Sequence, residues 1–359
     1  MFGSIKVRMG LFNKTNLLIA CLVGGGIYYA SHHYTLSGLD QVRVQSRDQS
    51  IPMRDWTDPR NWIPVTHSGN SSNPAALPTA TTLPSSSQES SLIPSKPVTP
   101  TIRVASFDLQ SYDERKSESV AVQEILTRVL RNFDVVAIQG ITSRQRDTLP
   151  KLIDRLNQDK HAFDYMVGPR VGPVHQSMHF AFIYNTDRVE TDRYQLYTME
   201  DPGELLDYDP LVGWFRSKSV VPQKALTFSL VNLYISPARS HQELNLLPAI
   251  TDSIQNDGRG EDDIVLAGGF SCSDKQLVML SQRKWGFAIQ NIPTTVAGDE
   301  MLDQIAFPPQ SIDEFTGRSG VIDFLRKFNL TLEQATQVSS HLPVWCEFFA
   351  EEGGYPGYR

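Results

Sequence analysis

Three residues with acid–base or metal-binding side chains stand at the ends of short apolar runs. Asp108 follows one run, Asp303 stands early in another, and His341 comes just before the last one. Two carboxylates and an imidazole are a plausible ligand set for a transition metal, and the same groups transfer protons in many active sites. The simpler interpretation, which we favour, is a hydrogen-bonded histidine before a core strand with Asp303 capping a strand end, because nothing in the sequence supplies the outer partners of a metal site.

A fourth apolar run ends without such side chains. Residues 264–267 lead directly into Gly268, Gly269, Phe270 and Ser271. A metal-dependent phosphoesterase would need two acidic or amide side chains at a strand end of this kind, since hard cations bind through oxygen ligands. The absence of those groups is the main constraint that the sequence places on function.

Short apolar runs alternate with amphipathic helices through the body of the chain. Strands are predicted at residues 103–107, 135–138, 180–184, 227–235, 264–266, 302–307 and 343–349. Helical spacing of apolar residues predicts helices at 122–133, 149–156 and 244–254. Residues 314–320 are polar with two glycines and are predicted as a loop. Because continuous apolar strands are buried on both faces, helices must cover the sheets, which predicts an α/β layered sandwich.

The order and surroundings of the strand ends resemble the endonuclease/exonuclease/phosphatase superfamily, most closely its deoxyribonuclease I branch. The similarity runs from Arg103 to Phe348 and includes stretches without catalytic residues, such as 104–108, 156–159 and 243–245. The resemblance implies an α/β (α+β) fold, namely a four-layered deoxyribonuclease I-like sandwich of two mainly antiparallel sheets flanked by helices. It also implies a family chemistry in which a divalent cation, a histidine paired with an acid, and further polar groups hydrolyse phosphate esters.

Most of the family's catalytic positions carry a different residue here. Asp108 stands where the family has an Asn and keeps an oxygen ligand, and only Asp303 and His341 retain the family residue. The degenerate positions are Gly140 in place of the metal-binding Glu, Tyr234 in place of an active-site His, Gly269 and Ser271 in place of the Asp and Asn of the G-D-F-N motif, and Ser340 in place of the acid that precedes and orients the last His.

These replacements remove each part of the implied chemistry. The cation loses its carboxylate ligand, the attacking water loses a base, and the phosphate loses polar contacts. The sequence therefore predicts a catalytically degenerate domain that acts as a binding or scaffolding module. The alternative is a divalent-metal-dependent phosphodiesterase (nuclease) or phosphatase with an altered metal site, in which Asp108 and Asp303 are ligands and Asp303 and His341 are catalytic. Mg²⁺ or another divalent cation is expected as a cofactor only if such a residual site survives.

The N-terminus is basic and then apolar. Residues 1–15 hold three basic residues, and residues 16–30 carry no charge and end close to Tyr28 and Tyr29. We predict a cytoplasmic N-terminus at 1–15 and an uncleaved transmembrane signal anchor at 16–30, with the globular domain outside the cytoplasm. A span needs roughly 20 residues, so a cleaved signal peptide is the competing interpretation.

The remaining segments complete the predicted domain organisation. Residues 31–100 form a juxtamembrane segment, to which no fold is assigned up to residue 64, and a linker. Residues 66–100 of the linker are rich in Ser, Thr and Pro and cannot bury enough apolar surface to fold. Residues 101–349 form the folded domain, and 350–359 form a C-terminal tail. The chain is thus predicted to be a single-pass membrane protein.

Charge and cysteine content restrict the partners. The formal net charge is −7, and residues 1–60 have more basic than acidic residues, so the rest of the chain is more acidic than the whole. An acidic body does not attract nucleic acid over long range. Nucleic-acid binding would need a local basic groove and is not favoured; the sequence does not identify a protein or other ligand. The 3 cysteines do not form a disulfide framework.

Overall fold

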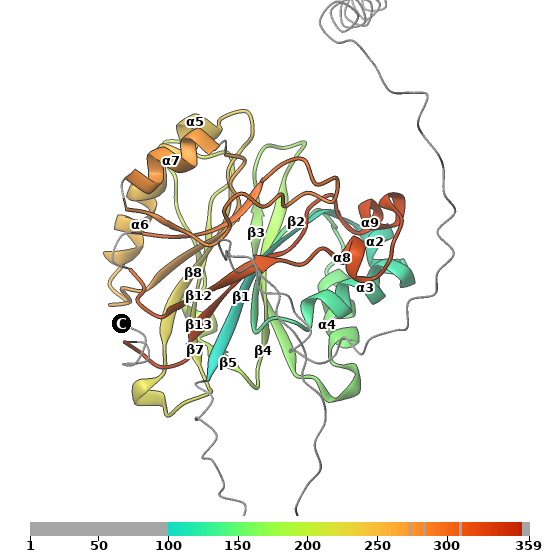
Figure 1. The fold of residues 1–359 in the computed structure, drawn as a ribbon, viewed down its shortest axis with the longest axis horizontal. Coiled ribbons are helices and arrows are strands. Elements are labelled where there is room, and N and C mark those ends of the chain that lie inside the picture. The colour runs from blue at the N-terminus through green and yellow to red at the C-terminus, as the bar shows by residue number, and fades with distance from the viewer. Residues whose placement is uncertain (1–99, 273, 283, 309–310, 354–359) are drawn as a thin grey trace, which may run out of the picture. The chain divides into compact units, whose positions relative to one another are not determined.

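The computed structural model describes residues 100–353 with the exception of residues 273, 283 and 309–310 (Figure 1). The predicted anchor, the linker and residues 354–359 lie outside the described residues. No helix in the described part of the chain is long and apolar enough to cross a membrane.

Two β-sheets form the centre of the domain. One has the strand order β12-β13-β1-β2-β4-β3, and the other has the order β10-β11-β9-β8-β7-β5 with β6 paired to β7. The strands of the first sheet are β1 (Thr101–Tyr112), β2 (Val135–Ile141), β3 (Phe163–Val171), β4 (Met178–Asn185), β12 (Phe315–Val321) and β13 (Val344–Phe349). Those of the second are β5 (Val189–Thr191), β6 (Tyr197–Thr198), β7 (Leu211–Ser217), β8 (Thr227–Tyr234), β9 (Ile264–Gly269), β10 (Gly286–Phe287) and β11 (Asp303–Phe307). Only β1–β2 and β8–β9 pair in parallel among the described strands, so both sheets are mainly antiparallel.

Helices cover the outer face of each sheet (Figure 1). On the first sheet lie α2 (Glu114–Glu118), α3 (Val120–Leu130), α4 (Thr148–Leu156), α8 (Phe324–Lys327) and α9 (Leu332–Val338). On the second lie α5 (Ser240–Glu243), α6 (Leu247–Gln255) and α7 (Asp274–Gln282). Single 3₁₀ turns occur at Gln158–Lys160, Arg193–Gln195, Pro222–Lys224 and Leu244–Leu246.

The main core lies between the sheets, where large side chains of both inner faces meet. Phe182, Phe215, Phe228 and Phe348 are fully buried there, and their rings contact one another in sequence. Such an aromatic core with helices outside both sheets gives four layers. The predicted four-layered sandwich is confirmed.

The structure corrects the predicted ends and loops of the domain. The predicted loop at 314–320 is mostly strand β12, whose pairing with β13 is interrupted by a register shift, so its residues do not alternate cleanly. The prediction that the tail begins at residue 350 is wrong, because Ala350 is fully buried and Glu351 bridges Ala225.

Helix α9 was not predicted, although Thr331 and Gln334 form a capping box at its start.

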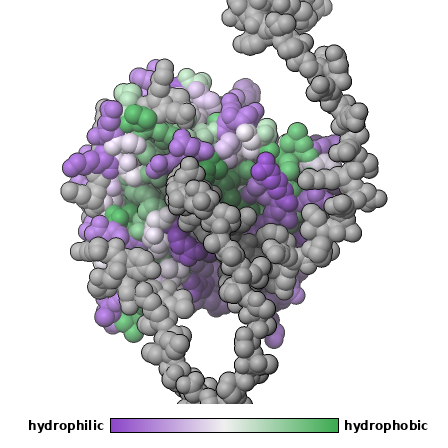
Figure 2. Space-filling model, viewed as in Figure 1, coloured by the Kyte–Doolittle hydropathy of each residue, from purple (hydrophilic) through white to green (hydrophobic). Residues whose placement is uncertain are grey.

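Apolar residues also reach the surface. Figure 2 shows hydrophobic residues among hydrophilic ones on the face where α5 and α7 lie. Val278 and Met279 of α7 are both more than half exposed. Scattered apolar side chains of this kind are normal on a folded domain and require no partner.

Candidate functional site

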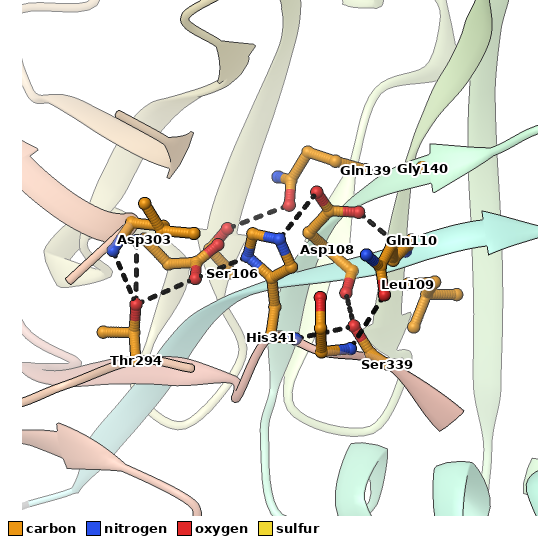
Figure 3. Close-up of polar contacts among 12 residues, drawn as sticks. Ser106, Asp108, Leu109, Gln110, Gln139, Gly140, Thr294, Asp303, Ser339 and His341 are labelled. Carbon is orange, nitrogen blue, oxygen red and sulfur yellow. Dashed lines mark hydrogen bonds and ion pairs between the residues drawn. The ribbon is translucent and has the colours of Figure 1, made fainter. Parts of the chain in front are cut away.

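The structure brings Asp108, Asp303 and His341 together at one end of the two sheets (Figure 3). Nδ1 of His341 lies 2.8 Å from Oδ2 of Asp303, and Nε2 lies 3.8 Å from Oδ2 of Asp108. Asp108 comes from β1, Asp303 begins β11, and His341 precedes β13. The imidazole is therefore held between two carboxylates that belong to different sheets.

Two hydroxyl side chains fix this arrangement. Oγ1 of Thr294 donates to Oδ2 of Asp303 at 3.0 Å and accepts from the backbone N–H of Asp303 at 3.0 Å. Oγ of Ser339 donates to the carbonyl of Asp108 at 2.7 Å and accepts from the N–H of His341 at 3.0 Å. Sequence reasoning missed both residues. Ser339 stands two positions before His341, which is the spacing of a hydroxyl that hydrogen-bonds to backbone nearby.

Ser340 does not decide how His341 is oriented. Its backbone N–H donates to Oε1 of Gln110 at 2.9 Å, and its carbonyl accepts from Val296. The prediction that loss of an acid at this position leaves His341 without an orienting carboxylate is wrong, because Asp303 performs that role from another strand. Adjacency in sequence was a poor guide to which acid contacts the ring.

The site is buried and charged. Burial lowers the pKa of His341, but the hydrogen bond to Asp303 and the charges of Asp303 and Asp108 outweigh it and raise the pKa to about 9. Burial raises the pKa of Asp303, and the hydrogen bond with His341 counters this in part. Oδ1 of Asp303 is buried and accepts no hydrogen bond within the described part of the chain. At neutral pH His341 carries a proton on both nitrogens, so it cannot accept another one.

Gly140 lies beside Asp108, and the space for a larger residue is occupied. Its φ of +74° is in the left-handed region, and an added Cβ would lie 2.4 Å from Oδ1 of Asp108 and 2.6 Å from the backbone nitrogen of Gln110. The N–H of Gln110 donates to that same oxygen at 2.7 Å, and the N–H of Gly140 donates to Sδ of Met178 at 3.2 Å. A Glu at position 140, where the resemblance implies the metal-binding residue, does not fit without a rearrangement of β1.

Tyr234 and Gly269 fill the neighbouring part of the site. They are aligned partners on the parallel strands β8 and β9, and a Cβ on Gly269 would lie 3.0 Å from the ring of Tyr234. Tyr208 packs against Tyr234 edge-on, with ring centroids 5.0 Å apart. Burial and the nearby Asp108 raise the pKa of Tyr234. Ser271, two residues past Gly269, has a φ of +43° and donates its N–H to the carbonyl of Leu302.

These residues do not match the family's divalent cation. Asp303 and Asp108 contact opposite nitrogens of His341, and one oxygen of Asp108 already accepts from Gln110. Among the described residues, the groups of three acidic, His or Cys side chains whose ligand atoms lie within 4.8 Å of one another do not include these three. Mg²⁺ requires near-octahedral oxygen coordination, so no catalytic step through such an ion follows from this geometry.

A buried polar network joins the two sheets beneath the site. Nε2 of Gln139 donates to Oδ1 of Asn232 at 2.7 Å, and Oγ of Ser106 donates to Oε1 of Gln139 at 3.2 Å. All three side chains are fully buried. The network fixes how the end of β2 sits against β8, and therefore where Gly140 and Tyr234 lie.

The two sheets with outer helices form an α/β sandwich of the deoxyribonuclease I type, with a carboxylate–histidine pair at their strand ends. The chain is 26% identical over 259 residues to Deoxyribonuclease-1-like 1 of Sus scrofa, covering 68% of this chain and 80% of that protein. It is 24% identical over 262 residues to Deoxyribonuclease gamma of Homo sapiens, covering 68% and 84%. The human Nocturnin catalytic domain has the same fold, with a TM-score of 0.50, 16% identity, and coverage of 70% of this chain and 95% of that one. No family model matches the chain.

The chain is thus similar in sequence and in fold to the endonuclease/exonuclease/phosphatase superfamily, and in sequence to its deoxyribonuclease I-like branch.

Proposed function

We propose that residues 101–349 form a catalytically degenerate member of this family that serves as a binding or scaffolding module. The observation that carries the proposal is the occupied space beside Gly140. Asp108 and the backbone of Gln110 lie within 2.6 Å of where a Cβ would stand. A metal-binding carboxylate at this position is incompatible with the present course of β1.

The packing of Tyr234 over Gly269 supports the same proposal. A truncated side chain in a buried site normally leaves a cavity that costs stability. Here the tyrosine ring lies where the motif Asp would project, and Tyr208 packs behind it. Neighbouring residues have replaced the lost groups with apolar contact, as expected for a site that is maintained for stability.

The alternative, a phosphodiesterase or phosphatase with an altered metal site at Asp108, Asp303 and His341, has less support. It needs three ligand atoms directed at one point, whereas the two carboxylates contact opposite sides of the imidazole. It also needs a proton acceptor, and His341 holds its proton between the two acids.

A turnover assay tests the proposal. The full chain, purified in mild detergent, is incubated with plasmid DNA, RNA and a phosphate monoester in Mg²⁺, Mn²⁺ and Ca²⁺, with bovine Deoxyribonuclease-1 as the active control. We expect no hydrolysis above the background. Turnover that disappears in His341→Ala and persists in His241→Ala, an exposed histidine outside the site, would overturn the proposal.

A protein or other non-nucleic ligand fits the acidic body better than DNA or RNA does. Retention on immobilised DNA in 50 mM salt that weakens steeply by 200 mM salt would instead indicate a nucleic-acid-binding module.

We also propose that residues 16–30 anchor the chain in a membrane, with the domain outside the cytoplasm. The support is the uncharged apolar run and its basic flank. Alkaline carbonate extraction of the full chain should leave it in the membrane pellet, and a chain that lacks residues 1–30 should become extractable. Full extraction of the intact chain would contradict the anchor.

A further inference from the structure

A second group of acidic side chains lies at the opposite end of the sheets from His341. Asp263 immediately precedes β9, whose other end is Gly269, and Glu352 follows β13, which His341 precedes. Glu314 precedes β12. Each of β9 and β13 has six residues, or about 20 Å of extended chain. The acidic group is therefore separate from the family site.

The three carboxylates converge. Each offers an oxygen, and these oxygens all lie within 4.8 Å of one another. Glu314 is 2% exposed and Asp263 is 7% exposed, whereas Glu352 is exposed. The group is therefore closed on the protein side and open to solvent on the side of Glu352.

One oxygen of Glu314 has no partner. Oε1 accepts from the N–H of Gly353 at 2.6 Å, but Oε2 is buried and accepts no hydrogen bond among the described residues. A buried carboxylate oxygen without a donor is costly and unusual. This carboxylate belongs to the convergent group, and a cation bound by the group would supply a positive partner for it.

Among the described residues, no basic side chain forms an ion pair with the group. Within the described part of the chain, none of the three carboxylates forms an ion pair with Lys or Arg, and the nearby Lys224 pairs with Glu351 instead. Burial, followed by the charges of Glu314 and Glu352, raises the pKa of Asp263 to about 9.

The adjacent Glu261 accepts a hydrogen bond at each of its carboxylate oxygens, whereas in the group of three Glu352 accepts from the N–H of Thr227 at 3.3 Å and Glu314 accepts at one oxygen only. The two oxygens of Glu261 accept from Nε1 of Trp214 at 2.8 Å and from the N–H of Asp263 at 3.1 Å. Its position beside the group adds negative charge, while its own hydrogen bonds hold the segment that presents Asp263.

We propose that Asp263, Glu314 and Glu352 bind a hard divalent cation of the Ca²⁺ class. The ligands are all oxygens, which such ions prefer, and Ca²⁺ accepts six to eight of them in irregular geometry. Waters complete the shell on the exposed side of Glu352. Mg²⁺ fits less well because it demands near-ideal octahedral geometry. The cation joins the segments before β9, before β12 and after β13, and so acts as a structural clip.

Calorimetry and thermal unfolding of the full chain test the site. The chain is stripped with EDTA and titrated with CaCl₂ alone, MnCl₂ alone or MgCl₂ alone. We expect saturable binding of one Ca²⁺ and a rise in Tm of about 5–10 °C at a hundred times Kd, since a ligand of the folded state stabilises it. Glu314→Gln should remove both signals. The matched control is Glu351→Gln, which lies one residue from Glu352 but pairs with Lys224, and it should retain both.

Two outcomes would overturn the proposal. One is the absence of heat and of a Tm shift with all three cations at 5 mM, which would mean that protons alone neutralise the acids. The other is an unchanged Ca²⁺ response in Glu314→Gln, which would place the ion elsewhere. If Glu314→Gln does not fold, calorimetry on Asp263→Asn and on the unmodified chain still decides between these results.

Discussion

The two ends of the sandwich differ in whether their carboxylates contact a basic side chain. At the end that holds His341, Gly140, Gly269 and Ser340 stand where the family resemblance implies acids, and Asp108 and Asp303 contact one histidine. At the other end, three carboxylates converge without any basic partner among the described residues. The same strands, β9 and β13, connect both ends.

The contrast shows that a family site is better judged by packing than by residue identity. Around His341 the spaces beside Gly140 and Gly269 are filled by Asp108, Gln110 and Tyr234, and the two carboxylates lie on either side of one histidine. Around Glu314 the three carboxylates have no basic partner among the described residues, so we expect a bound cation to supply the positive charge there. We expect substitutions that restore the family residues to destabilise the first end, and removal of cations to destabilise the second.

The largest expected effect comes from Gly140→Glu, which restores the family's metal ligand. The left-handed backbone costs a non-glycine residue about 1 kcal/mol or more, and the contacts with Asp108 and Gln110 add to this. We expect a loss of about 4 kcal/mol of unfolding free energy, measured by urea denaturation, and no gain of nuclease activity.

Gly258→Glu is the matched control. Gly258 has a similar φ of +85°, but nothing lies within 4 Å of the position of its Cβ. It should lose only about 1 kcal/mol. Equal losses in the two variants would show that the space beside Asp108 is not closed, and would weaken the comparison between the two ends.

The sequence was informative about the fold and about His341 because both depend on patterns along the chain. Apolar runs located the central strands, and the family resemblance located Asp303 and His341. The acidic group was missed because Glu314 lay in a predicted loop and Glu352 in a predicted tail. Only the sheet order brings these segments beside Asp263, and strand order is not encoded in local spacing.

The filled space over Gly269 was missed for a related reason. It depends on the register that aligns Tyr234 of β8 with Gly269 of β9. A register shift of one residue would direct the tyrosine ring to the other face of the sheet. A single sequence identifies the two residues but not their alignment.

A smaller effect is expected from His341→Gln, and it depends on pH. The folded-state pKa of His341 is about 9 against an ordinary value of 6.5. The stabilisation from its charge is therefore complete below pH 6.5 and is lost as the pH rises through 9. Urea denaturation should show the variant about 3 kcal/mol less stable than the unmodified chain at pH 6, with the difference mostly gone at pH 10.

The control for this pH dependence is His241→Gln, at an exposed helix position. It should change the unfolding free energy by less than about 0.5 kcal/mol at either pH. If the loss of unfolding free energy in His341→Gln stays constant from pH 6 to pH 10, the two carboxylates do not raise the pKa of His341. The interactions of His341 with Asp303 and Asp108 would then be weaker than their distances indicate.

The smallest expected effect tests whether Tyr234 occupies the place of the motif acid. Gly269→Asp introduces a Cβ 3.0 Å from the tyrosine ring, and the ring must shift, so we expect a loss of about 1–2 kcal/mol. Combined with Tyr234→Ala, the same substitution should cost about 1 kcal/mol less than it does alone, because contacting residues couple in a double-mutant cycle. Additive losses in urea denaturation would mean that the ring and the glycine are independent, and that the space over β9 is open to an acid after all.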